Sequence, residues 1–232
     1  MNFADVIIWY VVFIFSTVVH EASHAFIAFK FGDTTAYNEG RVSLNPIPHM
    51  KKEPMGTIII PFISLFSFGW MIGWAKTPYS LRWADANIKK AGMMSAAGPL
   101  SNLLLLLITS LIIHLGIGVG MFNPHPFHVK ISSLVLSTET GQLEFITKIL
   151  SIMFSMNLVL FIFNILPFPP LDGSGIPLIF LNNEKGKRYL EVTRKPAYSI
   201  LGLFASWLLF GFLFSQIFIF AVNLLYQGGH YT

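Results

Sequence analysis

Residues 19–25 read Val-His-Glu-Ala-Ser-His-Ala, and they lie within an apolar stretch that runs from about residue 5 to residue 31. A stretch of about 20 apolar residues is long enough to cross the hydrocarbon core of a bilayer as a helix. An ionisable side chain inside such a helix costs at least ~2.5 kcal/mol. The stretch therefore predicts a membrane-spanning helix and a function for its ionisable residues.

The two histidines of this stretch are spaced for binding one metal ion. His20 and His24 are four positions apart, so on a helix their imidazoles lie on one face, one turn apart. Glu21 follows the first histidine, where its carboxylate can take a proton from a water molecule that the metal activates. The alternative is a set of buried, hydrogen-bonded histidines without a metal. The His-Glu-x-x-His pattern inside a span favours the metal site.

The composition assigns the chain to the membrane proteins. Of its 232 residues, 54% are hydrophobic and 11% are charged, and the mean hydropathy is +0.65, whereas a soluble domain carries about 25% charged residues. We predict one all-α, polytopic membrane domain over residues 1–232. Its roughly four spanning helices are expected at about 5–31, 91–119, 144–166 and 198–226.

Several kinds of site and partner are excluded or not required. The chain has no cysteine, so disulfides and thiolate-bound zinc are excluded, and any metal must be held by His, Asp or Glu. The net charge of +4 requires no nucleic-acid partner, because Lys and Arg in a membrane protein first report orientation. The N-terminus has no basic residue before the first apolar run, so we expect no cleavable signal peptide.

The distribution of Lys and Arg predicts the orientation of the spans. The first and third connections between spans are rich in Lys and Arg, whereas the second connection and both termini are poor, which places both termini outside. A fifth apolar stretch, 56–74, is interrupted by Pro61 and Gly69. A full crossing there would break the alternation, so we expect a re-entrant or interfacial segment. Residues 38–44 alternate loosely and suggest a short strand beside the membrane.

A zinc protease site needs a third protein ligand and an open position for water, and Asp172 is the best candidate. Residues 164–173 read Asn-Ile-Leu-Pro-Phe-Pro-Pro-Leu-Asp-Gly and follow the third span. Three prolines end the helix here, and a broken helix at membrane depth is tolerated only where it faces protein or a water-filled cavity. The first and third spans run in the same direction, so Asp172 and His24 fall on the same side. An ordinary Asp-Gly turn is the alternative.

With these two motifs the chain resembles the site-2 proteases, a family of intramembrane zinc metalloproteases. The resemblance lies in the pattern that begins at His20 and in the Asn-x-x-Pro-x-Pro-x-Leu-Asp-Gly pattern of 164–173. Lesser matches are found at 40–49, 73–76 and 97–102. The chain departs from the family pattern after residue 76, where Thr-Pro-Tyr replaces a more common Pro-x-Pro, and its length leaves no space for the PDZ or CBS domains of many relatives.

The resemblance implies one zinc ion per chain, bound by His20, His24 and Asp172, with Glu21 activating the water. It also implies that Asn164 helps to position the substrate or to stabilise the reaction intermediate. The implied substrate is a transmembrane segment of another protein, which is unwound before cleavage in the lipid bilayer. The resemblance and the small size suggest a multi-pass protein of a prokaryotic inner membrane, with its active site toward the cytoplasm.

The sequence thus predicts an intramembrane zinc metalloendopeptidase, with two alternatives. A metal or proton transporter or channel explains the ionisable residues inside a span, but it gives Glu21 no special position. A homologue that has lost activity and only binds membrane partners is the second alternative. Asn102 and Asn157 are interpreted as hydrogen-bond partners between helices. A functional role for His49, in the family-like loop, stays open.

Overall fold

The computed structural model describes residues 2–125, 129–139, 141–226 and 231. Within this part of the chain, four helices are long and apolar enough to cross a membrane. They are α1 (Phe3–Lys30), α6 (Ile88–Gly118), α7 (Gln142–Ile165) and α9 (Pro196–Leu225). Even the shortest, with 24 residues, is about 36 Å long at 1.5 Å per residue. The prediction of an all-α, polytopic membrane protein is confirmed, and each predicted span ends within three residues of its helix.

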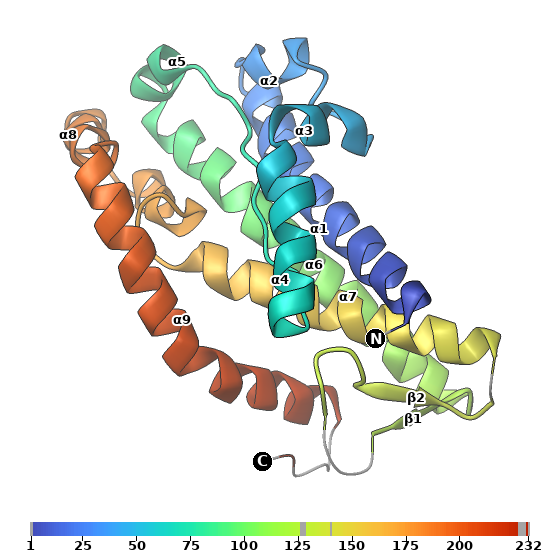
Figure 1. Cartoon of the computed structure of the whole chain (residues 1–232). Helices are drawn as coiled ribbons and strands as arrows, with labels where there is room; N and C mark the ends of the chain where they lie inside the picture. Colours follow the sequence, from blue (N-terminus) through green and yellow to red (C-terminus); the bar gives the residue numbers. More distant parts are fainter. Residues whose placement is uncertain (1, 126–128, 140, 227–230, 232) are drawn as a thin grey trace.

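Helices α1, α6 and α7 pack against one another at the centre of the bundle (Figure 1). Ser16 of α1, Asn102 of α6 and Asn157 of α7 are completely buried between them and are linked by hydrogen bonds. Because lipid is as apolar as the helix surfaces, spanning helices associate through such hydrogen bonds and through close packing. Helix α9 packs on α7 through aromatic contacts such as Phe163 with Phe210.

The fifth apolar stretch forms a hairpin that enters the bundle and returns. A π-helical turn, η1 (Met55–Ile59), continues into α4 (Ile60–Phe68), which ends at Gly69 with a positive φ of 79°. The chain then runs back in extended conformation to α5 (Leu81–Ala86), so both ends of the hairpin lie at the same end of the bundle (Figure 1). The amide of Trp74 donates to the carbonyl of Gly56 at 3.1 Å and joins the two arms. This is the arrangement of a re-entrant segment, as predicted.

The predicted strand over residues 38–44 is wrong. The chain forms α2 (Thr35–Asn38), turns at Gly40 with a φ of +71°, and continues to α3 (Pro46–Lys52) without a strand. The guanidinium of the buried Arg41 donates a hydrogen bond to the carbonyl of Lys76. Residues 38–44 are therefore held by this side-chain contact instead of by backbone pairing with another strand. The described residues contain one small antiparallel sheet elsewhere, formed by β1 (Phe122–Pro124) and β2 (Val135–Ser137).

The two ends of the bundle differ in composition and structure. One end holds α2, α3 and α5, together with α8 (Asn183–Thr193), and these belong to the two connections rich in Lys and Arg (Figure 1). The opposite end holds the sheet, the start of α1 and the end of α9 (Figure 1). An ion pair of 2.7 Å between Asp85 and Arg194 joins the two basic connections to each other. Both basic connections therefore face the same side, as the orientation prediction requires.

Candidate metal centre

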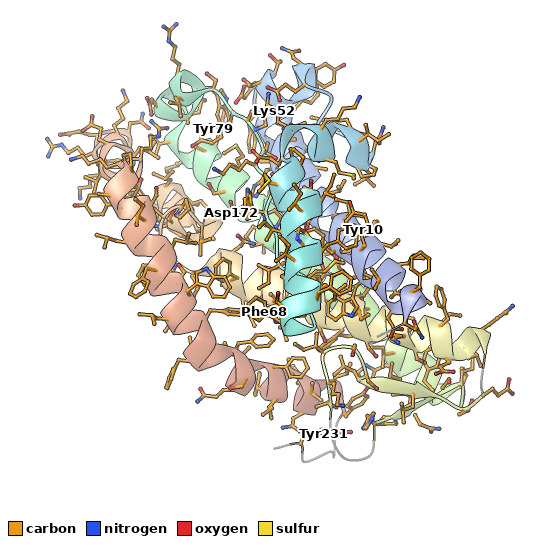
Figure 2. The ribbon with its side chains drawn as sticks, in the orientation of Figure 1. Tyr10, Lys52, Phe68, Tyr79, Asp172 and Tyr231 are labelled. Carbon is orange, nitrogen blue, oxygen red and sulfur yellow. The ribbon has the colours of Figure 1, made fainter. Side chains whose placement is uncertain are left out.

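Three predicted metal ligands converge in the interior of the bundle. His20 and His24 are buried in α1, and Asp172 begins the 3-10 turn η2 (Asp172–Ser174) after α7. The Oδ2 atom of Asp172 lies 2.9 Å from Nε2 of His20 and 3.2 Å from Nε2 of His24. The two Nε2 atoms are 3.1 Å apart. Figure 2 shows Asp172 among the helices, away from both ends of the bundle. All three donor atoms can thus reach one ion.

The other ring nitrogens of the two histidines contact hydrogen-bond acceptors on α6. Nδ1 of His20 lies 2.6 Å from Oδ1 of Asn102, and Nδ1 of His24 lies 2.7 Å from the carbonyl of Met94. Because both partners accept, each Nδ1 carries the proton, and each Nε2 has its lone pair directed at the point of convergence. A hydrogen bond that fixes the tautomer in this way is the usual support of a metal-binding histidine.

Asn102 is held by contacts from two further helices. Its Nδ2 donates to Oδ1 of Asn157 at 2.9 Å and to the carbonyl of Ser16 at 3.3 Å, so Oδ1 is the atom that faces His20. Asn102 and Asn157 are hydrogen-bond partners between helices, as interpreted from the sequence. The additional contact of Asn102 with a predicted ligand was not foreseen. The sequence feature that could have indicated this contact is the spacing of Gly98 and Asn102, which are four positions apart and therefore lie on the same face of α6.

Gly98 leaves the space that the two imidazoles occupy. A Cβ atom at this position would lie 2.5 Å from Nε2 of His20 and still closer to Nε2 of His24. Any residue other than glycine would therefore displace the rings. Two imidazole nitrogens and one carboxylate oxygen form a donor set that suits zinc. The ring tautomers and the close approach at Gly98 show that this donor set fits the ion.

The proline-rich turn after α7 places Asp172. The backbone amide of Leu171 donates to the carbonyl of Phe168 at 2.9 Å, which closes the turn in front of the aspartate. Behind it, the amide of Gly175 donates to the carbonyl of Asp172 at 2.8 Å. The side chain of Asp172 is 25% exposed, whereas each of the two histidine side chains is 7% exposed. The point of convergence is therefore reached from the side of Asp172.

Glu21 is buried next to the first histidine. Its carboxylate oxygen Oε2 accepts a hydrogen bond of 2.7 Å from the hydroxyl of Thr77, which lies on the returning arm of the re-entrant hairpin. The carboxylate of Glu21 thus lies at the junction between α1 and the hairpin. This position gives a buried acid-base group a fixed partner within the bundle.

The structure gives no support for a direct role of Asn164 or His49. The Nδ2 atom of Asn164 donates to the carbonyl of Leu160 in its own helix at 3.0 Å. In the described residues, no hydrogen bond joins Asn164 to a predicted ligand or to Glu21, so its role stays a prediction. His49 is buried in α3, with Nε2 3.2 Å from the carbonyl of Ser43. Burial lowers the pKa of His49 below its usual value of 6.5.

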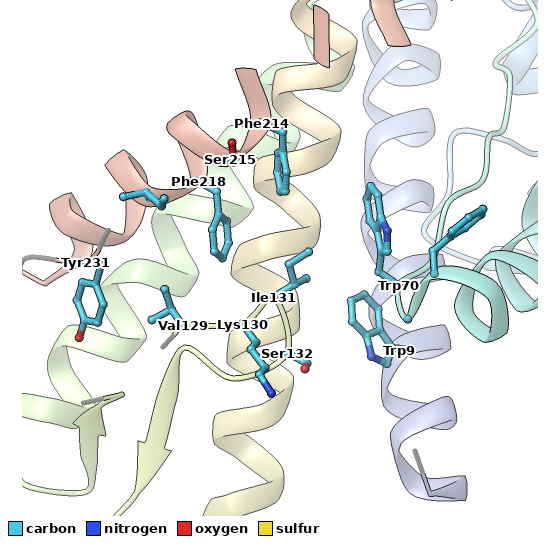
Figure 3. A pocket seen from close by; sticks show the side chains of 13 residues that line it. Trp9, Trp70, Val129, Lys130, Ile131, Ser132, Phe214, Ser215, Phe218 and Tyr231 are labelled. Atoms are coloured by element: carbon cyan, nitrogen blue, oxygen red, sulfur yellow. The ribbon is translucent and has the colours of Figure 1, made fainter. Parts of the chain in front are cut away.

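A separate cavity lies between α1, the tip of the re-entrant hairpin and α9. It has a volume of about 510 Å³, and Figure 3 shows Trp9 and Trp70 on one side of it, with Phe214 and Phe218 on the other. Trp9 precedes His20 by eleven positions, about 16 Å along the helix. The predicted metal ligands do not line this cavity.

The comparison with known protein families identifies the chain. The model of peptidase family M50 matches residues 8–210, a range that contains both motifs and most of the four long helices. The chain belongs to this family. Membership agrees with the resemblance to the site-2 proteases that the two motifs indicate.

Two curated relatives are similar to this member of the M50 family. YwhC of Bacillus subtilis (strain 168) is 38% identical over 160 residues, which are 69% of this chain and 63% of the relative. Rip2 of Mycolicibacterium smegmatis is 27% identical over 169 residues, which are 73% of this chain and 55% of the relative. Both are named as candidate zinc metalloproteases. The chain thus spans less than two thirds of each relative, and no solved structure matches it significantly.

Proposed function

We propose that this chain is a zinc-dependent endopeptidase that cleaves other proteins in or near their membrane-spanning segments. The observation that supports this function most is the convergence of His20, His24 and Asp172, next to Glu21, in the interior of a membrane bundle. Membership in peptidase family M50 supports the hydrolytic chemistry. The names of the two relatives support the choice of zinc.

The proposed ligands hold one zinc ion per chain through Nε2 of His20, Nε2 of His24 and the carboxylate of Asp172. When bound, zinc supplies a Lewis acid that polarises the scissile carbonyl and makes water a better nucleophile near neutral pH. Asn102 and the carbonyl of Met94 keep both rings in the binding orientation. The chain itself thus preorganises all three ligands.

Glu21 is the proposed general base. Its carboxylate accepts a proton from the attacking water, and it returns that proton to the nitrogen of the leaving amine. The two transfers balance, so Glu21 is a carboxylate again at the end of the cycle. Burial of Glu21 keeps competing bulk water away from both transfers. Asn164 is retained, on the resemblance alone, as a residue that helps to position the substrate or to stabilise the reaction intermediate.

The proposed substrate is an unwound transmembrane segment. The proposed centre lies among spanning helices, so a substrate peptide bond must enter the bundle to reach it. The Asp172 side chain is more exposed than that of His20, which makes its side the more open approach. An intact helix cannot present a free carbonyl there, because each interior carbonyl is bonded within the helix.

The proposed location is a prokaryotic inner membrane, with the centre toward the cytoplasm. Both connections rich in Lys and Arg lie at one end of the bundle, and such connections are cytoplasmic. Asp172 opens the connection between α7 and α8, which belongs to this end. Water from the cytoplasm therefore has the shorter path to the proposed ligands.

The transporter alternative is less well supported than the protease. A transport pathway needs polar groups along its length. The cavity between α1, the tip of the re-entrant hairpin and α9 is lined mainly by apolar and aromatic residues, and Lys130 is the one charged residue among them. This lining does not continue the cluster of ionisable residues across the bundle.

The decisive experiment measures cleavage of a single-span substrate by the purified protein in detergent. The wild type is expected to cleave, a chelator to stop cleavage, and added zinc to restore it. Glu21→Gln is expected to keep one zinc per chain and to lose about 10²–10⁴-fold in kcat, by loss of the base. Glu184→Gln, a surface carboxylate on α8, is the matched control and keeps full activity. Cleavage by Glu21→Gln at the wild-type rate would refute the proposed mechanism.

A further inference from the structure

The returning arm of the re-entrant hairpin passes directly beside Glu21. Oγ1 of Thr77 on this arm lies 2.7 Å from Oε2 of the Glu21 carboxylate and 2.9 Å from the backbone carbonyl of the same residue. A hydroxyl group carries a single proton and can rotate to suit its acceptor. The shorter contact, to the carboxylate, is the charge-assisted and stronger one. Thr77 therefore donates its proton to Oε2.

We propose that Thr77 is the positioning residue of Glu21, and that its hydroxyl orients the carboxylate for proton transfer. This inference rests on the proposed function, in which Glu21 is the general base. Within the described ranges, no other side chain donates a hydrogen bond to this carboxylate. The contact engages Oε2 and leaves Oε1 to take part in the proposed proton transfer. Without the hydroxyl, the flexible glutamate side chain loses its fixed orientation.

The position of Thr77 is itself fixed by contacts on both sides. Before it, the carbonyl of Lys76 accepts a hydrogen bond from the buried guanidinium of Arg41. After it, the amide of Ser80 donates to Oδ2 of Asp33 at 2.8 Å. A segment anchored in this way presents the hydroxyl in one place, and a positioning contact is effective only when its own position is defined.

The contact depends on the hydroxyl of Thr77, which Pro78 follows in the chain. A proline at residue 77 has no hydroxyl and no amide hydrogen, so it cannot donate a hydrogen bond to Glu21. Pro78 also restricts Thr77 to an extended backbone, which agrees with the absence of helix between 69 and 80. Orientation of the base by a hydroxyl thus requires a hydroxyl-bearing residue at position 77.

Thr77→Val is the direct test, because it removes the hydroxyl and nearly preserves the shape. The variant is expected to lower kcat by about 10-fold to 150-fold, the range for a lost hydrogen bond to a charged group. KM is expected to stay within about twofold, and zinc content and thermal midpoint are expected to match the wild type. Thr77→Ser keeps a donor and is expected to recover kcat to within about threefold of the wild type.

A second threonine provides the matched control. Thr109 is buried in α6, and its hydroxyl donates to the carbonyl of Leu105 at 2.7 Å. Thr109→Val deletes the same atoms at a site without contact to Glu21, and it is expected to cleave at the wild-type kcat. If Thr77→Val does not accumulate as folded protein, Thr77→Ala is compared with Thr77→Ser in the same assays.

The possible results separate this inference from the proposed function. Wild-type kcat in Thr77→Val, with an inactive Glu21→Gln, overturns the positioning role and leaves the protease intact. A lower kcat that Thr77→Ser does not restore, or one that accompanies loss of zinc or a lower thermal midpoint, indicates a structural role and also overturns it. Wild-type cleavage by Glu21→Gln overturns both proposals at once.

Discussion

Replacement of Gly98 by alanine is predicted to abolish zinc binding while the bundle stays folded. The added Cβ would lie 2.5 Å from Nε2 of His20, and ordinary van der Waals contact begins at 3.4 Å, so this ring must retreat by about 0.9 Å. The ring of His24 must retreat further. Metal–ligand distances tolerate about 0.2 Å, so both bonds are lost or severely strained. We expect zinc affinity to fall by at least ~100-fold, because mutation of a residue that merely orients a metal ligand already lowers affinity by up to ~100-fold.

The assay is a competitive zinc titration of the purified variant, with thermal unfolding measured separately in the presence of a chelator. Overpacking in a core costs about 1–3 kcal/mol, so the chelated variant is expected to unfold at a modestly lower temperature. Gly211→Ala on α9 is the matched control, because a Cβ there meets nothing within 4 Å. Zinc affinity of Gly98→Ala within about threefold of this control would refute the described convergence of the two imidazoles.

Three further predictions concern the same centre and its neighbourhood. Asn102→Ala frees the ring of His20 and is expected to weaken zinc binding by about 10–100-fold; unchanged affinity in the same titration would contradict this role. Chelation is expected to lower the thermal midpoint, because zinc at 100 times its Kd stabilises the folded state by ~2.7 kcal/mol; zinc but not magnesium should restore it. The folded state depresses the pKa of His49, so it binds fewer protons than the unfolded state, and segment 40–52 loses stability as pH falls below 6.5. Amide protection factors of this segment, which correct for the slower intrinsic exchange at low pH, should fall on acidification in the wild type, and His49→Gln should lack this response.

The sequence predicted the long helices well, because a span needs only an uninterrupted apolar run. The structure also brings Asp172 to His20 and His24, although Asp172 lies 152 positions after His20. The four-residue spacing of His20 and His24 on α1 limits where the two imidazoles can point. The turn after α7 does the same for the carboxylate of Asp172. Both features are local, and hydrophobicity, helix periodicity and proline geometry are sufficient to recognise them.

The parts that could not be predicted depend on contacts between distant segments. Residues 38–44 alternate in the manner of a strand, but a strand needs a partner, and Arg41 instead contacts Lys76, thirty-five residues later. The contact of Thr77 with Glu21 spans 56 residues, and the contact of Asn102 with His20 spans 82. Threonine and asparagine are common in loops and helices, so neither position is conspicuous before the fold brings it to the site.

The separation of the ligands along the chain determines when the centre can form during synthesis. His20 and Asp172 are 152 positions apart, and a ribosome adds about 5–20 residues per second. Synthesis of Asp172 thus follows that of His20 by roughly 8–30 s. On the proposed function, a growing chain therefore cannot cleave its neighbours in the membrane until Asp172 has been made.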